Sequence, residues 1–186
     1  VDATKGVQNL FETRELLIEA FKEVVNRGPR SHENLLGVKV LLRDAKLHED
    51  AIHRGPAQTI PAVRNAINGS MLTAGVTLME PKQSVYISVP QEQMGAVTGE
   101  MSQRRSEIAG METEGDLAII TAKAPVKEML GFASEIRSAT AGRALWSTEF
   151  AGYEPLPREL LDEVTAEIRE RKGLKAEVPL ASNYGS

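Results

Sequence analysis

The first hydrophobic pattern along the chain is helical and the second is extended. Between residues 10 and 25 the apolar side chains fall on one stripe, and the charged side chains occupy the other faces of the same helix. This pattern ends at Gly28-Pro29, since glycine adopts a left-handed conformation easily and proline cannot continue the hydrogen-bond ladder. Val38, Val40 and Leu42 then alternate with Lys39 and Arg43, which predicts a strand with one buried face.

A second helix is predicted shortly after this strand. Apolar residues recur at spacings of three and four between Ile60 and Met71, with Thr59 placed as the N-cap and Pro61 in the first turn. The polar residues 47–58 therefore form a loop that leads from a strand into a helix.

The later patterns follow the order strand, helix, strand, strand, helix, strand. These six elements are expected over residues 85–89, 94–101, 108–111, 117–124, 129–136 and 144–150. Glu114-Gly115-Asp116 is typical of a hairpin turn, and the nearly continuous apolar run that follows it predicts a central strand covered on both faces. The order is that of the ferredoxin-like split βαβ arrangement, an antiparallel sheet with both helices on one face.

The chain is therefore expected to be an α+β protein with two α/β-sandwich modules. The helical pattern of the first module stops at Gly75 and a strand pattern begins after Pro81. We assign residues 1–80 to the first module and residues 81–155 to the second, ferredoxin-like one. Residues 156–186 are expected to form a C-terminal helix and an extended tail.

Composition narrows the class of protein. With 186 residues and 41% hydrophobic content the chain can bury a core, and domains of about 100–200 residues allow one or two of them. The absence of cysteine excludes disulfides, thiolate zinc sites and cysteine nucleophiles, and it suits a cytoplasmic location. The apolar runs are far shorter than the roughly 18 residues of a membrane span. The opening Val1-Asp2-Ala3-Thr4-Lys5-Gly6 reads like the interior of a longer chain, so we expect truncation or processing.

Charge limits nucleic-acid contacts to local patches. The net charge of −4 argues against general phosphate binding, but residues 38–64 hold five Lys or Arg and two His against three acidic residues. Arg104 and Arg105, near the end of a predicted helix, are candidates for RNA backbone contacts, and surface cations that complement the helix dipole are the alternative. The RNA recognition motif shares the predicted element order, but residues 117–124 contain no aromatic side chain, which disfavours base stacking on the sheet.

Two histidines and an aspartate in the loop suggest a metal site. His48, Asp50 and His53 are ligand types, but a spacing of five does not place both histidines on one helix face, and no third strong ligand is evident nearby. A metal-dependent hydrolase remains an alternative that requires stoichiometric metal. No nucleophile stands in a recognisable catalytic context, and the phosphate-binding pattern G-x-x-x-x-G-K-[ST] is missing, so we expect no catalytic residue and no GTPase activity in this segment.

His53 has the neighbours of a contact residue. Arg54 adds a fixed cation, and Gly55 and Pro56 favour a tight turn between the flanking strand and helix. We expect a rigid tip that presents an exposed imidazole and an exposed guanidinium to phosphates or base edges.

The chain resembles the elongation factor 2 family, the archaeal and eukaryotic counterpart of bacterial elongation factor G. The family's tip signature is similar to Leu47-His48-Glu49-Asp50-Ala51-Ile52-His53-Arg54-Gly55. Residues 1–8 resemble the run that precedes it in the fourth domain, residues 131–144 resemble the fifth domain, and residues 171–179 resemble the C-terminal tail. Eukaryotic members usually have Gly-Gly-Gly in place of Gly55-Pro56-Ala57, so the archaeal branch fits better.

The resemblance implies a function for the loop. His53 is expected to be the histidine that is converted to diphthamide, and the tip is expected to enter the decoding region of the ribosome during GTP-dependent translocation of tRNA and mRNA. GTP and Mg would bind in an N-terminal domain outside this chain, which itself holds no cofactor and no metal. The residues expected to contact RNA or the ribosome are His48, Asp50, His53, Arg54, Gly55, Gln58, Arg104 and Arg105.

The implied partners are the ribosome with its rRNA, tRNA and mRNA, the diphthamide-synthesis enzymes and ADP-ribosylating toxins, with no membrane. A free-standing ferredoxin-like RNA-binding or regulatory module is the other reading of the same elements.

Overall fold

The computed structural model describes residues 1–185, which form two compact units. One unit, called the helical unit below, contains Val1–Thr77 and the chain from Pro157 onwards. The other, called the sheet unit, contains Leu78–Leu156. The chain thus leaves the helical unit once and returns to it for its C-terminal helix.

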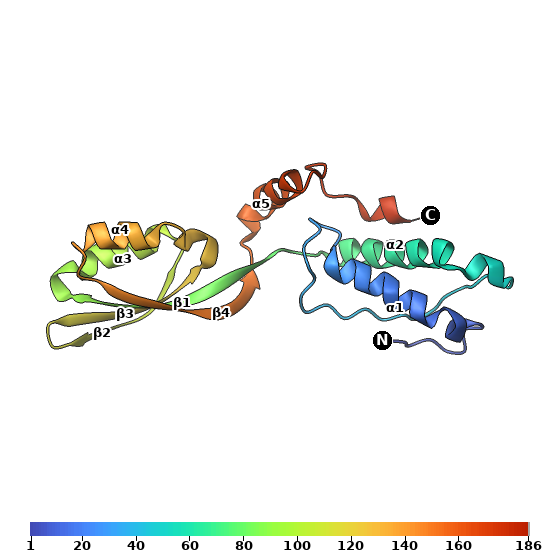
Figure 1. Ribbon diagram of the computed structural model, residues 1–186, viewed down its shortest axis with the longest axis horizontal. Coiled ribbons are helices and arrows are strands. Elements are labelled where there is room, and N and C mark those ends of the chain that lie inside the picture. Colours follow the sequence, from blue (N-terminus) through green and yellow to red (C-terminus); the bar gives the residue numbers. More distant parts are fainter. Residues whose placement is uncertain (186) are drawn as a thin grey trace. The chain divides into compact units, whose positions relative to one another are not determined.

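The sheet unit has the predicted order of strands and helices, and the expected α+β class is confirmed. Its elements are β1 Met79–Pro90, α3 Met94–Gln103, β2 Glu107–Glu114, β3 Leu117–Pro125, α4 Phe132–Ala139 and β4 Leu145–Pro155, with short 3₁₀ turns at Gln91–Gln93 and Val126–Met129. The strands form one antiparallel sheet in the order β2-β3-β1-β4. Helices α3 and α4 lie on the same face of this sheet (Figure 1).

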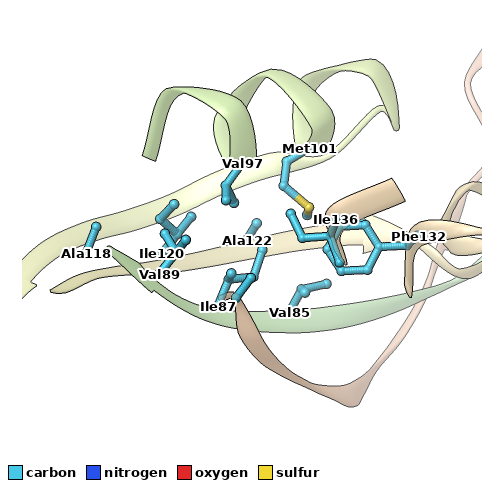
Figure 2. Packing of buried hydrophobic residues seen from close by; sticks show 12 residues of the cluster. Val85, Ile87, Val89, Val97, Met101, Ala118, Ile120, Ala122, Phe132 and Ile136 are labelled. Atoms are coloured by element: carbon cyan, nitrogen blue, oxygen red, sulfur yellow. The ribbon is translucent and has the colours of Figure 1, made fainter. Parts of the chain in front are cut away.

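The core of the sheet unit lies between that face and the two helices. Val97 and Met101 of α3 and Phe132 and Ile136 of α4 are all buried, and Figure 2 shows them pointing toward the sheet. The sheet contributes a row of apolar side chains from each central strand: Val85, Ile87 and Val89 from β1, and Ala118, Ile120, Ala122 and Ala124 from β3. Alternate residues of each strand therefore make the core, as the ferredoxin-like order requires.

The expectation that the third strand is covered on both faces is wrong. In β3, Ala118, Ile120 and Ala122 are buried, while the intervening Ile119 and Thr121 are only half-buried. Both helices lie on one face, so the other face of the strand has no layer above it within the sheet unit. An apolar residue on that open face, such as Ile119, makes the apolar run of residues 117–124 almost continuous in sequence although only one face of the strand is buried.

The helical unit is built on two packed helices. Helix α1 is Leu10–Asn26 and α2 is Pro56–Ala74, and they lie side by side (Figure 1). Both helices were predicted, but the predicted N-cap of the second, Thr59, is wrong. Gly55 is the N-cap and Pro56 is the first helical residue, a position where the missing N–H of proline costs no hydrogen bond. Thr59 is buried in the first turn, where its hydroxyl donates to the carbonyl oxygen of Arg54 at 3.1 Å.

The strand expected over residues 38–42 does not form. The segment is extended, but its pairing is limited to one parallel bridge between Leu42 and Asp2. The amide of Leu42 donates to the carbonyl of Val1 at 2.9 Å, and the amide of Ala3 donates to the carbonyl of Leu42 at 2.8 Å. Within residues 1–185, the backbone pairing of this segment is limited to these first few residues, so no ladder develops.

The C-terminal helix α5, Arg158–Arg171, is anchored within the helical unit by its last turn. Arg169 is 4% exposed and donates to the carbonyls of Lys175 and Arg30, each at 2.6 Å. Lys172 donates to the carbonyl of His32 at 2.7 Å. Cations at the C-terminal end of a helix complement its dipole, and here they also bind backbone carbonyls of Arg30 and His32 in a loop far away in the sequence.

The tail ends in a 3₁₀ turn, Ala181–Tyr184, that packs on α2. Gly69 of α2 lies under this turn, and a Cβ at that position would be 3.4 Å from the Cβ of Tyr184. Leu180, just before this turn, is 69% exposed. The close approach to a glycine shows that the tail is fitted to the helix surface.

Candidate functional site

The tip loop, residues 47–58, contains the short 3₁₀ helix Ala51–Arg54 and runs directly into α2. His48 accepts a hydrogen bond at Nδ1 from the amide of Asp50 at 3.0 Å. The carboxylate of Asp50 then accepts from the amide of Ile52 at 3.1 Å, which caps the 3₁₀ helix. His48 and Asp50 therefore shape the backbone from which the next side chains project.

His53 is exposed, as expected for a contact residue. Its amide donates to the carbonyl of Asp50 at 3.2 Å, so its backbone is held by the same turn. The imidazole rings of His53 and His48 meet edge to face, with centroids 4.5 Å apart and an interplanar angle of 65°. Ile52, beside them, is 73% exposed. The loop thus presents two imidazoles and an apolar side chain to solvent from a fixed backbone.

The expected exposed guanidinium of Arg54 is wrong. Its side chain is 8% exposed and turns back into the loop. Nη1 donates to the carbonyl oxygens of His48 at 2.7 Å and Glu49 at 2.6 Å, and Nη2 donates to the carboxylate of Glu12 at 2.5 Å. The carbonyls of His48 and Glu49 have no partner within the turn at Asp50, and the planar guanidinium binds both of them.

The last two predicted residues of the loop lie at the start of α2. Gly55 has φ −72° and ψ 171°, ordinary extended backbone, so it acts as the helix N-cap rather than in a tight turn. Gln58 is exposed in the first turn, and its amide donates to the carbonyl of Gly55 at 3.2 Å. The structure thus brings six of the eight predicted contact residues into one loop.

The other two, Arg104 and Arg105, lie in the sheet unit and are not free surface cations. Arg104 is 7% exposed and donates to the carbonyls of Glu128 and Leu130. Two carboxylates also accept from it, Glu100 at 3.1 Å and Glu135 at 2.7 Å. Its donors bind the loop that precedes α4 and two carboxylates beside it, and contact of this side chain with RNA stays a prediction.

Arg105 is paired with acids of two other segments. It donates to Glu80 at 2.9 Å and to Glu128 at 3.0 Å. Burial alone would raise the pKa of Glu80, but hydrogen bonds from Arg105 and Lys82 outweigh it and hold that pKa below its usual value. The hydrogen bond to Glu80 in turn raises the pKa of Arg105. This cluster of opposite charges neutralises the cation that the sequence suggested for phosphate binding.

Glu12 is the residue of this site that the sequence did not reveal. It stands 42 residues before Arg54 in the first turn of α1, where an acidic residue is ordinarily explained by the helix dipole. No local spacing connects it with the tip loop. Only the packing of α1 along α2 brings the two side chains together.

No group of three or more His, Cys, Asp or Glu side chains suited to a metal ion occurs within residues 1–185. Likewise, none of the helices described over that range combines the length and the hydropathy needed to cross a bilayer.

Two family profiles match consecutive parts of the chain. The profile "Elongation factor G, domain IV" matches residues 1–75, and the profile "Elongation factor G C-terminus" matches residues 77–164. The chain is 60% identical over 185 residues to elongation factor 2 of Methanococcoides burtonii and 57% identical over 184 residues to that of Methanosarcina mazei. The elongation factor 2 of Archaeoglobus fulgidus is 55% identical over 183 residues.

These alignments cover 98–100% of this chain but 25% of each relative, so the chain spans about a quarter of their length. A crystal structure of a protein from Thermus thermophilus superposes with a TM-score of 0.74 at 26% identity, covering 91% of this chain and 25% of that one. The matches run through both units and agree with the archaeal character of the tip loop. The chain therefore belongs to the elongation factor 2 and elongation factor G family, in which it corresponds to domain IV and C-terminal sequence.

Proposed function

We propose that this chain is the ribosome-contacting C-terminal part of an elongation factor 2, and that its tip loop reaches the decoding region during GTP-dependent translocation of tRNA and mRNA. The observation that carries the proposal is the exposed His53 on a loop with fixed backbone, within a chain that matches archaeal elongation factor 2 throughout. An exposed imidazole can donate to phosphate oxygens or pair with base edges.

The contacts divide into two classes in this proposal. His53 with its neighbours His48, Asp50, Gly55 and Gln58 offers side chains and backbone at the loop surface. The three arginines act indirectly, since their donors are bound to carbonyls and carboxylates of the chain itself: Arg54, Arg104 and Arg105. The partners are rRNA, tRNA and mRNA, with the enzymes that synthesise diphthamide and the ADP-ribosylating toxins acting on His53.

GTP and Mg belong to another part of the full-length factor. This chain has no G-x-x-x-x-G-K-[ST] sequence and so no backbone cradle for a triphosphate. Its own contribution is a shaped surface that follows the moving tRNA.

Replacing His53 with Ala in the full-length factor is expected to slow single-round translocation about tenfold, which equals about 1.4 kcal/mol of lost interaction. The measurement is the rate of translocation at saturating factor, with GTP hydrolysis recorded in parallel and expected to be unchanged. His32→Asn is the matched control, because His32 is an exposed histidine of the same unit in the left-handed conformation that Asn tolerates. Equal translocation rates for His53→Ala and the wild type would overturn the proposal.

His53 is also proposed to carry diphthamide in protein from an archaeal host. Its exposure leaves the ring open to a modifying enzyme, whereas His48 uses Nδ1 within the loop. Peptide mass spectrometry of residues 47–64 is expected to place the added mass on His53. An unmodified peptide from native full-length protein would rule the modification out.

A further inference from the structure

Arg54 is enclosed although the residue before it is exposed. Its guanidinium has five N–H groups, of which Nη1 serves the carbonyls of His48 and Glu49 and Nη2 serves the carboxylate of Glu12. The remaining nitrogen, Nε, is buried and lacks a hydrogen-bond partner within the described chain. Three N–H groups of the guanidinium are thus bound within the protein and the side chain is 8% exposed, so an outside phosphate would have to compete with these bonds.

Glu12 offers this guanidinium a fixed point. It lies in the first turn of a 17-residue helix, where the dipole favours a carboxylate. Helix α1 is itself held against α2 by the core residues Val24, Ile67 and Met71. The carboxylate is 57% exposed, so its partner Arg54 is the more enclosed member of the pair.

We infer that Glu12 is a positioning residue for the tip loop: its carboxylate orients Arg54, and Arg54 fixes the carbonyls on which the turn carrying His53 is built. The inference rests on the proposed function of His53 as the contact residue. It assigns Arg54 to the interior of the loop, and it makes an acidic side chain on another helix part of the RNA-contacting apparatus. Without the guanidinium, the carbonyls of His48 and Glu49 would lose the donor that they share.

The sign of the effect of Glu12→Gln separates this role from an electrostatic one. Neutralising an acid beside RNA would speed a reaction that depends on attraction to phosphate. Positioning predicts the opposite, a fall of about two- to fivefold in the plateau rate of translocation, the size expected for one partly exposed ion pair. The factor concentration at half-maximal rate should stay the same, whereas a loss of folded protein would raise that concentration and leave the plateau intact.

Glu23→Gln is the matched control. Glu23 of α1 pairs with Arg64 of α2 at 2.9 Å, and its position is eleven residues, about 16 Å, further along the helix. The same chemical change there should leave the rate unaltered. Arg54→Lys, which keeps the charge but loses the planar fork, should slow translocation at least as much as Glu12→Gln.

Hydrogen exchange of the full-length factor supplies a readout that does not depend on the ribosome. The amides of Asp50, Ile52 and His53 should exchange faster in Glu12→Gln than in the wild type. Their exchange rates should be unchanged in Glu23→Gln. A Glu12→Gln factor that translocates as fast as or faster than the wild type, with unchanged exchange, would overturn the inference. If His53→Ala alone had no effect on translocation, the proposed function would fail, and faster exchange in Glu12→Gln would still support the positioning of the loop.

Discussion

Replacing Arg104 with Ala is expected to lower the free energy of unfolding of the sheet unit by about 3 kcal/mol, since removing this enclosed cation leaves the enclosed carboxylate of Glu100 without its partner. The side chain is 7% exposed, and its loss leaves the carbonyls of Glu128 and Leu130 without their donor. It also removes a guanidinium that lies 5.4 Å from the ring centroid of Phe132, in the core. Denaturant unfolding followed by the fluorescence of Trp146 measures the change, because this single tryptophan contacts Phe132.

Arg143→Ala is the control for that substitution. Arg143 pairs with Glu92 in the same unit, but the two side chains are 50% and 67% exposed. Such a pair contributes about 0.5 kcal/mol, because water screens it and both side chains lose freedom in forming it. If Arg104→Ala cost no more than Arg143→Ala, the interior role assigned to Arg104 would be wrong.

Hydrophobic periodicity was sufficient to predict the sheet unit. Strands β1 and β3 bury alternate residues and helices α3 and α4 bury helically spaced ones against one shared core, so in these four elements the pattern in the sequence matches the burial in the fold. The outer strands β2 and β4 add the partly buried Ile108 and Trp146 to this core. Periodicity could not predict whether the second face of β3 is covered by another layer. A run of apolar residues is the same whether the second face is covered or open, and Ile119 is apolar on the open face.

In the helical unit the predicted strand failed to form because a strand depends on a neighbouring segment to pair with. Val40 and Leu42 are half-buried and Leu41 between them is exposed, but a strand also needs a neighbour with which to form a ladder. Here that neighbour is three residues long, and one bridge results. The start of α2 at Pro56 was missed because Thr59 is an equally good cap by residue type alone.

The candidate site divides in the same way. The exposure of His53 follows from a polar loop just ahead of a regular helix, which local sequence can indicate. The partners of the arginines lie far away in sequence: 42 residues separate Arg54 from Glu12, and 31 separate Arg104 from Glu135. A sequence records that a cation is present, but only tertiary packing determines whether the cation faces solvent or binds carbonyls inside the protein.

Replacing Ile120 with Ala is expected to destabilise the sheet unit by about 4 kcal/mol, through the lost transfer free energy of the side chain and the cavity that remains. Ile120 is fully buried on β3, opposite Ile87 of β1 and Met111 of β2, and beneath α3 (Figure 2). The midpoint of denaturant unfolding, followed by Trp146, should fall while the slope with denaturant stays constant, because the fold remains the same. Ile119→Ala removes the same atoms from the adjacent, half-buried position and should cost about 1 kcal/mol, because less apolar surface returns to water. Equal losses for the two variants would mean that both faces of β3 are covered, as the unbroken apolar run in the sequence suggests, and would contradict the one-sided core.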